Sequence, residues 1–284
     1  MRPLGIYLWF GYDLAPQKSL ELIRAAGFDS VSLWWGEYSC APAPGVQARW
    51  AGENGLSLDS AHFPDKGADT LWQPGSAGDR LAQTVRQALF QCGEAGVPVL
   101  VMHLTEGFRQ PPFTQWGMER LRRLADAAAE AKVRLALENL PCPYHLAEAL
   151  EALPGPEVGL CWDTGHAYFG RKMAERGERK PFPAFPGRFA SRIAAVHLHD
   201  NDGTWDQHRL PFEGGIDWDA AMRELACSGY EGGLHLEVQG AFGGFREDGE
   251  AAARVFLKRA HTVARRLRGR LEQYRQEEGN SVKE

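Results

Sequence analysis

Short apolar runs alternate with amphipathic helical stretches along the whole of this chain of 284 residues. Each run has the length of a strand, and each longer stretch spaces its apolar residues as a helix does. The eight expected strands are Leu4–Trp9, Ser30–Trp34, Leu56–His62, Val97–His103, Arg134–Glu138, Glu157–Asp163, Ile193–His199 and Gly233–Val238. Repeated strand–helix units predict a parallel sheet, because a helical crossover returns the chain to the edge where it started.

One expected helix follows each strand. The helices are Pro16–Ala26, Val46–Asn54, Asp79–Ala95, Gln115–Ala131, Tyr144–Ala152, His166–Arg176, Asp217–Ser228 and Asp248–Tyr274. Gly27 and Gly96 stand where C-terminal caps are expected, and Asp79 and Asp217 where N-caps are expected. Eight right-handed units can close into a barrel, so we predict an α/β fold of the (β/α)8 TIM barrel type. We expect one domain over residues 1–274 and a polar, frayed tail over 275–284.

Charge and cysteine usage limit the partners and the compartment. The formal net charge is −5 and the pI about 6.0, which disfavours nucleic acid, although a local basic patch could still bind it. Five scattered cysteines without a CxxC pair indicate reduced thiols and a cytoplasmic protein. We find neither a signal-peptide pattern nor an apolar run near the ~20 residues that span a bilayer, so no membrane partner is expected. A homo-oligomer is left open.

Polar residues that can bind metal end six of the expected strands or lie just after them. The nine candidates are His62, His103, Glu138, Asp163, His166, His197, Asp206, His208 and Glu237. A single histidine or glutamate in such a place is usually a solvated loop residue. Repetition over six strands argues otherwise, since the carboxyl ends of the strands meet at one mouth of a parallel barrel. The pattern therefore predicts a polynuclear metal site at that mouth.

Two short motifs add to this prediction. Asp163-Thr-Gly-His166 ends a strand and enters a helix, so both side chains can reach one metal cluster. The alternative is an aspartate N-cap with an incidental histidine. Asp206-Gln-His208 lies in a long loop, where one intervening residue lets both side chains reach one ion. The alternative for this pair is an ordinary polar surface loop.

Four segments resemble a known superfamily. They are Leu137-Glu-Asn-Leu-Pro141, Cys161-Trp-Asp-Thr-Gly-His-Ala167, Val196-His-Leu-His-Asp-Asn201 and Asp206-Gln-His208 with Gly214-Gly-Ile-Asp-Trp218. They are similar to segments of the xylose-isomerase-like TIM barrels. That superfamily joins sugar and sugar phosphate isomerases and epimerases to abasic-site nucleases of the endonuclease IV type. The motifs identify the superfamily but do not separate its members.

The epimerase branch gives the leading hypothesis. The resemblance implies one divalent ion held by Glu138, Asp163, His197 and Glu237. The two glutamates would then remove and return a proton beside a carbonyl, and His166 would contact the substrate. We thus expect a metal-dependent sugar or sugar phosphate isomerase or epimerase with a small carbohydrate as its partner.

The nuclease branch is the alternative. It implies three zinc ions, with His62, His103, Asp206 and His208 as added ligands. Asp65 stands near the place where the nuclease pattern has a tyrosine, and an acidic residue there would repel phosphate. A metal-assisted lyase or hydrolase on a modified sugar, and an inactive sugar-binding barrel, are further readings. Manganese or zinc suits the donors best, with cobalt or magnesium as alternatives, in one to three ions.

Four further residues are candidates for substrate contact, namely Trp9, Trp34, His199 and Arg246. Aromatic residues near the mouth, Trp9 and Trp34 above all, can stack on a sugar, although simple packing explains such residues equally well. His199 lies one pleat beyond His197 and is expected to face the mouth. Arg246 follows a glycine-rich segment and could hold a phosphate or a hydroxyl. The segment Gly170–Arg188 is a candidate lid or a surface excursion.

Overall fold

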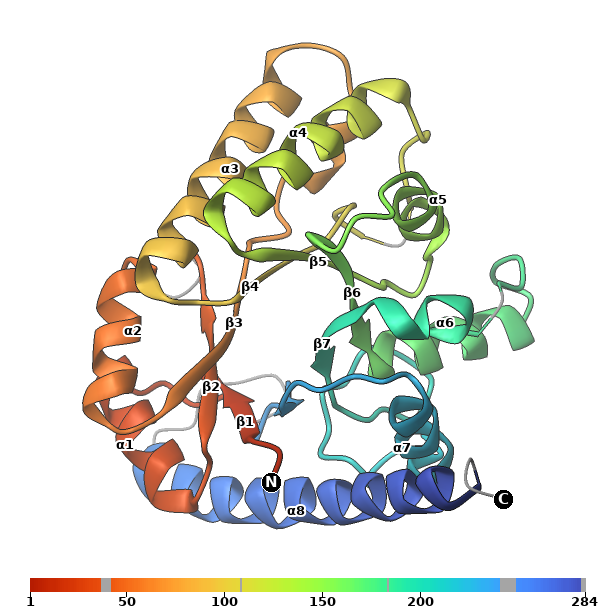
Figure 1. The fold of residues 1–284 in the computed structure, drawn as a ribbon. Helices are drawn as coiled ribbons and strands as arrows, with labels where there is room; N and C mark the ends of the chain where they lie inside the picture. Colours follow the sequence, from red (N-terminus) through yellow and green to blue (C-terminus); the bar gives the residue numbers. More distant parts are fainter. Residues whose placement is uncertain (37–41, 108, 183, 241–248, 282–284) are drawn as a thin grey trace.

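Eight parallel strands form a nearly closed barrel in the computed structural model, which describes residues 1–36, 42–107, 109–182, 184–240 and 249–281 (Figure 1). The strands are β1 (Leu4–Tyr7), β2 (Ser30–Trp34), β3 (Ser57–His62), β4 (Val99–Met102), β5 (Arg134–Glu138), β6 (Val158–Asp163), β7 (Ile193–His197) and β8 (Leu234–Leu236). Each strand pairs with its neighbour in sequence, and β1 also pairs with β8. Between β7 and β8, Leu198 N–H donates to His235 O at 2.9 Å and Glu237 N–H donates to Leu198 O at 3.3 Å. The predicted (β/α)8 architecture is confirmed.

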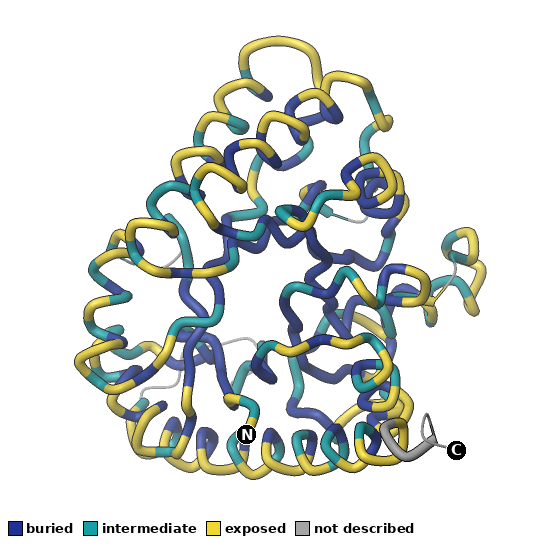
Figure 2. The backbone as a smooth tube through the Cα atoms, viewed as in Figure 1, coloured by how far each residue is buried: buried dark blue, intermediate teal, exposed yellow. Residues whose placement is uncertain are grey.

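Helices surround the barrel and expose their outer faces to solvent (Figures 1 and 2). They are α1 (Pro16–Ala26), α2 (Pro44–Glu53), α3 (Ser76–Ala95), α4 (Gln115–Ala131), α5 (Tyr144–Ala152), α6 (Thr164–Glu175), α7 (Trp218–Cys227) and α8 (Gly249–Ser281), with 3-10 turns η1 (Ala68–Trp72) and η2 (Gly187–Arg192). Gly27 and Gly96 end α1 and α3 in the left-handed conformation, as predicted. The Asp217 side chain caps α7 by accepting from Ala220 N–H at 3.0 Å.

The largest differences from the predicted helix boundaries are at the start of α3 and at the end of α8. Helix α3 begins at Ser76, and its N-cap is Gly75, so the N-cap assignment of Asp79 was wrong. Asp79 instead accepts a hydrogen bond from Nε of the buried Arg120 at 3.0 Å, because this guanidinium needs a counter-charge. Helix α8 continues past Tyr274 to Ser281, and the Tyr274 hydroxyl donates to Asp219 on α7 at 2.7 Å.

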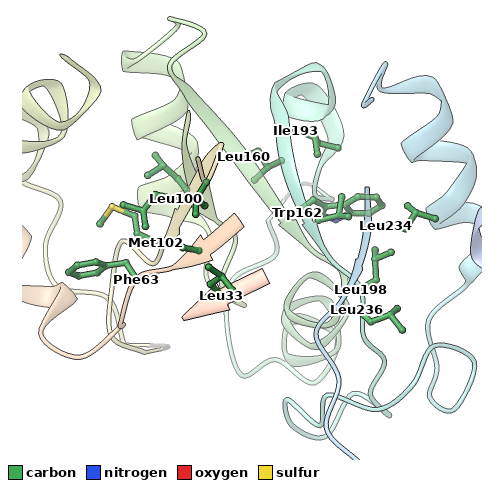
Figure 3. Close-up of a cluster of buried hydrophobic side chains, with 14 of the residues drawn as sticks. Leu33, Phe63, Leu100, Met102, Leu160, Trp162, Ile193, Leu198, Leu234 and Leu236 are labelled. Carbon is green, nitrogen blue, oxygen red and sulfur yellow. The ribbon is translucent and has the colours of Figure 1, made fainter. Parts of the chain in front are cut away.

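Alternation along each strand separates two layers of side chains. Outward residues such as Leu160 and Trp162 join the large core between strands and helices (Figure 3). Inward residues form a small cluster inside the barrel that consists of Val101, Ala136, Cys161 and Ala195. Two positions further along the same strands come His103, Glu138, Asp163 and His197. Small side chains thus fill the interior of the barrel. The next layer, at the carboxyl ends of the strands, holds residues of the types that can bind metal.

The expectations for the cysteines and for membrane-spanning helices can be compared with the structure. Cys92, Cys142, Cys161 and Cys227 are free, and Cys40 lies outside the described residues. Within the described ranges, no helix combines the length and the apolar character that crossing a membrane requires. The longest, α8, has 33 residues but is rich in arginine.

Candidate metal centre

Glu138 is the central carboxylate of the site. It ends β5 with only 2% of its surface exposed, and four imidazoles surround it. Its Oε2 atom lies 3.0 Å from Nε2 of His62, 3.3 Å from Nε2 of His103 and 3.2 Å from Nδ1 of His197, while its Oε1 atom lies 3.2 Å from Nδ1 of His166. Burial raises the pKa of Glu138, but His197 and His103 outweigh this and hold the pKa well below its usual range. Glu138 is therefore ionised at neutral pH.

The first potential metal site consists of Glu138, Asp163, His197 and Glu237, whose donor atoms all lie within 4.8 Å of one another. His197 Nδ1 is 3.1 Å from Oε2 of Glu237 and 3.2 Å from Oε2 of Glu138. It is buried and makes no hydrogen bond to either oxygen. The nitrogen and the two oxygens therefore lie close together without a hydrogen bond between them. This arrangement suits a cation between them.

The second potential site consists of His62, His103 and Glu138, again with donor atoms within 4.8 Å. His62 Nδ1 lies 2.7 Å from the carbonyl oxygen of Phe63 and donates its proton there. The Nε2 lone pair of His62 then faces Glu138. Nε2 of His103 is buried without a hydrogen-bond partner. Glu138 is common to the first two sites and could bridge two ions.

Asp206 contacts two imidazoles of the candidate set. Its Oδ2 atom lies 3.1 Å from Nε2 of His166 and 3.0 Å from Nε2 of His208. The Nδ1 atoms of the same two rings lie 3.1 Å from Asn139 O and 2.8 Å from Glu237 O. Carbonyl acceptors at Nδ1 fix the tautomer that presents Nε2 as a ligand. Burial lowers the pKa of His208, but Asp206 outweighs this and raises it to about 10.

The loop that carries Asp206 and His208 is fixed by Asp200. This fully buried carboxylate accepts from Phe212 N–H at 3.0 Å, Ile216 N–H at 3.2 Å and Trp218 Nε1–H at 2.8 Å. His208 adopts a φ of 45°, a left-handed conformation that a non-glycine residue rarely keeps without support. The Asp-x-His motif is thus part of a rigid, inward-facing loop and not an ordinary polar surface loop.

The nine residues predicted as ligands all meet at one mouth of the barrel. Together they offer imidazole nitrogens and carboxylate oxygens, the donors that zinc, manganese and cobalt accept. Several of these donors are buried and make no hydrogen bond, namely His103 Nε2, His197 Nδ1 and Asp206 Oδ1. Buried polar atoms without partners are costly, and a cation would satisfy them. The residues therefore fit the divalent metal that the resemblance implies.

A cavity of about 750 Å³ lies directly above this cluster. Its walls include Trp9, Trp34, His62, His103, Glu138, His166, Asp206, His208 and Glu237. Trp9 and Trp34 thus stand where the sequence placed them. Asp13 and Asp65 also line the cavity, whereas none of the described lining residues is a lysine or an arginine. The volume is typical of a site for a small molecule.

Two predicted substrate contacts and the candidate lid segment are not found among the described residues that line this cavity. His199 does not line the cavity: it is fully buried, and its Nε2 lies 2.9 Å from Asp163 Oδ2. Its ring fits against Gly165, where a Cβ atom would lie 1.9 Å from it, so His199 supports Asp163 from behind. Arg246 lies outside the described residues. The segment Gly170–Arg188 does not line this cavity and instead contributes to a second one beside α6.

Gln47 is a buried polar lining residue that the sequence analysis did not identify. Gln47 on α2 is fully buried, and its amide nitrogen donates to Trp34 O at 2.8 Å and to Pro42 O at 2.6 Å. Its Oε1 atom is buried without a hydrogen-bond partner. A glutamine within a helix gives no sequence signal for this role.

Comparison with known proteins agrees with the fold. An uncharacterized protein of Sinorhizobium fredii is 26% identical over 90% of this chain and 89% of its own length. Fructoselysine 3-epimerase of Escherichia coli is 27% identical, but over 46% of this chain and 49% of its own length.

Solved structures of sugar epimerases have the same architecture. L-ribulose 3-epimerase matches with a TM-score of 0.71 and 18% identity over 99% of this chain and 98% of its own. D-psicose 3-epimerase of Clostridium cellulolyticum H10, determined with D-tagatose, matches with a TM-score of 0.69 and 16% identity over 95% and 99%. At these identities the likeness establishes the fold alone. The family model described as xylose isomerase-like TIM barrel matches residues 20–268. Because that match spans most of the sequence, the chain belongs to the xylose isomerase-like TIM barrel family.

Proposed function

We propose that this protein is a metal-dependent sugar isomerase or epimerase. The observation that carries the proposal is that Glu138 and Glu237 both line the cavity, with their Oε2 atoms 3.2 and 3.1 Å from the same Nδ1 atom of His197. One such carboxylate can take a proton from a substrate in the cavity while the other returns one. The sugar 3-epimerases among the structural neighbours support this choice within the family.

Both glutamates are ionised and can act as bases. Burial raises the pKa of Glu237, but His197 outweighs it and lowers the pKa to about 2. The pKa of Glu138 is lowered in the same way. A general base must be unprotonated before it accepts a proton, and these shifts provide that state at neutral pH.

Glu138, Asp163, His197 and Glu237 would hold the divalent ion. When bound, such an ion supplies Lewis acidity, which makes the hydrogen on a carbon beside a carbonyl easier to remove. Asn139 and His199 fix Asp163 in place: the Asn139 amide donates to Asp163 O at 2.8 Å, and Nε2 of His199 contacts both carboxylate oxygens.

The reaction that fits these residues is a proton transfer at one carbon. One glutamate takes the proton from the carbon beside the carbonyl, and the electron pair of that C–H bond moves toward the carbonyl to give an enediolate. The other glutamate returns a proton. Return to the opposite face of the same carbon gives an epimer, and return to the neighbouring carbon gives an isomer. His166, which lines the cavity beside Glu138, would contact a substrate hydroxyl.

The cavity walls favour a sugar without phosphate. Trp9 and Trp34 offer ring faces to the apolar side of a sugar, and Oε1 of Gln47 offers an acceptor to a hydroxyl. The acidic residue Asp13 would repel a phosphate group, and the described walls hold no lysine or arginine to attract one.

Solvent-isotope incorporation tests the proposal. The metal-loaded protein is incubated with a panel of ketoses in heavy water, and deuterium in recovered and product sugars is measured by mass spectrometry. We expect one deuterium per conversion, and Glu138→Gln and Glu237→Gln should lower the rate by about 10²–10⁴-fold. Glu231→Gln changes an exposed carboxylate far from the cavity and serves as the control. Wild-type turnover by either active-site variant would sink the assignment.

A polynuclear phosphodiesterase is the second candidate. It is favoured by the two further donor groups, His62 with His103 and Asp206 with His166 and His208, which a single-ion epimerase does not require. Metal content of the purified protein and nicking of an abasic DNA duplex decide between the candidates. About three zinc ions per chain with nicking that is lost in Asp206→Asn would replace the first proposal by the second.

A further inference from the structure

A second cavity, of about 430 Å³, lies on the outer side of the barrel wall. It is bounded by β6 at Trp162, by α6, by the start of α7 and by Arg179, Pro181, Phe182, Ala184 and Phe185. His166 lines this cavity as well as the central one. An occupant would therefore lie against a residue that also faces the metal centre. The volume is sufficient for a small organic ligand.

Most of the wall of this second cavity is apolar. Pro141, Phe182, Phe185, Ile216 and Ala221 contribute to it. The rings of Phe182 and Phe185 stack with centroids 5.5 Å apart, and Phe182 meets Tyr144 edge-on at 5.1 Å. Such a wall favours a ligand with an apolar body over a free sugar or an inorganic ion.

Two hydrogen-bond donors of this wall have no acceptor. Nε1 of Trp162 and Nη1 of Arg179 are buried and make no hydrogen bond. Trp162 as a whole is only 3% exposed. A buried indole N–H normally has a partner, and a buried charged donor without one is costly. Both donors belong to residues that line the same cavity, which therefore offers space for an acceptor.

The charged side chains of the cavity wall are Arg171, Arg179, Glu175, Asp217 and Glu224. Glu175 pairs with Lys172 at 2.7 Å and Arg171 at 3.8 Å, Glu224 accepts from Gly187 N–H at 3.2 Å, and Asp217 caps α7. Arg179 contacts Lys180 O at 3.4 Å, and among the described residues no carboxylate lies within 4.0 Å of its guanidinium. Arg179 is therefore a guanidinium that has no ion-pair partner among the described residues and lies beside an apolar wall.

We propose that this cavity is a binding site for a small carboxylate with an apolar or aromatic body. The carboxylate would accept from Arg179 and Trp162, and the body would pack against Phe182, Phe185 and Pro141. A charge-assisted hydrogen bond to a carboxylate is about twice as strong as a neutral one, which is why an anion suits this wall better than a neutral amide. The proposal does not depend on the reaction at the metal centre.

Benzoate and benzamide are suitable probes, because they share a shape and differ in charge. Calorimetric titration of the full chain should show saturable 1:1 binding of benzoate, at least about tenfold tighter than benzamide. In parallel, benzoate should shift the indole N–H resonance of Trp162, which is identified by its disappearance in Trp162→Phe. No saturable binding of benzoate, or equal binding of both probes, would overturn the proposal.

Substitutions distinguish this cavity from other sites on the protein. Arg179→Gln should weaken benzoate binding about tenfold and leave benzamide unchanged. Arg171→Gln is the matched control, because Arg171 lines the same cavity but is paired with Glu175 and lies over the Tyr168 ring at 5.0 Å. It should change benzoate affinity less than twofold. Equal losses in both variants, or none in Arg179→Gln, would contradict the assignment of Arg179 as the anchor.

Discussion

Nε2 of His199 lies 2.9 Å from Oδ2 and 3.1 Å from Oδ1 of Asp163, so one buried imidazole contacts both oxygens of that carboxylate. Asp163 Oδ1 also accepts from His166 N–H at 2.6 Å. Asp163 is thus the N-cap of α6, which the sequence suggested as an alternative to metal binding. Capping does not prevent the same carboxylate from serving as a metal ligand. The same contacts that cap α6 orient the carboxylate toward His197.

Replacing His199 should weaken metal binding without removing a ligand. His199→Phe keeps a flat ring against Gly165 but cannot donate to Asp163. Loss of such a supporting partner typically lowers metal affinity about 10–100-fold. Competition with a chromophoric chelator measures this affinity. His145→Phe, at a buried histidine outside the cluster, is the control and should bind metal as the wild type does. Unchanged affinity in His199→Phe would show that the contact has no supporting role.

The metal-free protein should lose stability as the pH rises from about 7 to about 10. The pKa of His208 is raised to about 10 in the folded chain, against about 6.5 in an unfolded chain. The stabilisation by the protonated ring is complete below the unfolded value and is lost as the pH passes through the folded value. Metal affinity should rise over the same interval, because the ion replaces that proton.

Thermal unfolding of the metal-free protein at a series of pH values checks this expectation. His208→Gln cannot gain the proton and should have a flatter melting temperature across the interval. The difference in melting temperature between the two proteins gives the contribution of His208 separately from that of the tyrosines and lysines, which also titrate at high pH. A melting temperature that is constant or rises in the wild type would contradict the expected coupling between His208 and Asp206.

Gly5→Ala should destabilise the barrel strongly. A Cβ at this position would lie 2.0 Å from the ring of His235. That ring cannot move aside easily, because Ser30 Oγ and Ser32 Oγ hold its two nitrogens at 2.9 and 2.8 Å. Overpacking of this kind costs about 3 kcal/mol of unfolding free energy. Gly269→Ala, on the exposed side of α8 with open space around it, should be neutral or stabilising by up to about 1 kcal/mol. Equal stability of both variants in urea unfolding would contradict this account.

The placement of the candidate metal-binding side chains was predictable because the barrel has a simple geometry. A strand places alternate residues on the same side, and parallel strands in register bring their ends to one level. Asp163 pairs in register with His197, whereas Glu138 pairs with Cys161, two residues before Asp163. Despite this step between β5 and β6, alternation turns the polar residue at the end of each run toward the inside of the barrel. The residues of one central layer could be identified one strand at a time.

The supporting contacts were not predictable in the same way. The orientation of His199 depends on the absence of a Cβ at Gly165, which lies on another strand–helix unit. Gln47 reaches the cavity from a helix. Trp162 and Arg179 line the same second cavity only because the chain after α6 returns toward β6. These relationships arise from packing between distant segments, for which strand alternation gives no information.

Gln47→Met should reduce substrate binding more than turnover. The Gln47 amide holds the backbone at Trp34 and leaves Oε1 free at the cavity wall, whereas methionine fills the same space without polar atoms. On the proposed reaction, KM should rise about tenfold and kcat should change little, because Gln47 lies away from the two glutamates. Gln91→Met is the matched control: Gln91 also bonds to a tryptophan, Trp35 Nε1 at 2.7 Å, but does not line the cavity. A fall in kcat at unchanged KM would place Gln47 at the reacting carbon instead of at a distant hydroxyl.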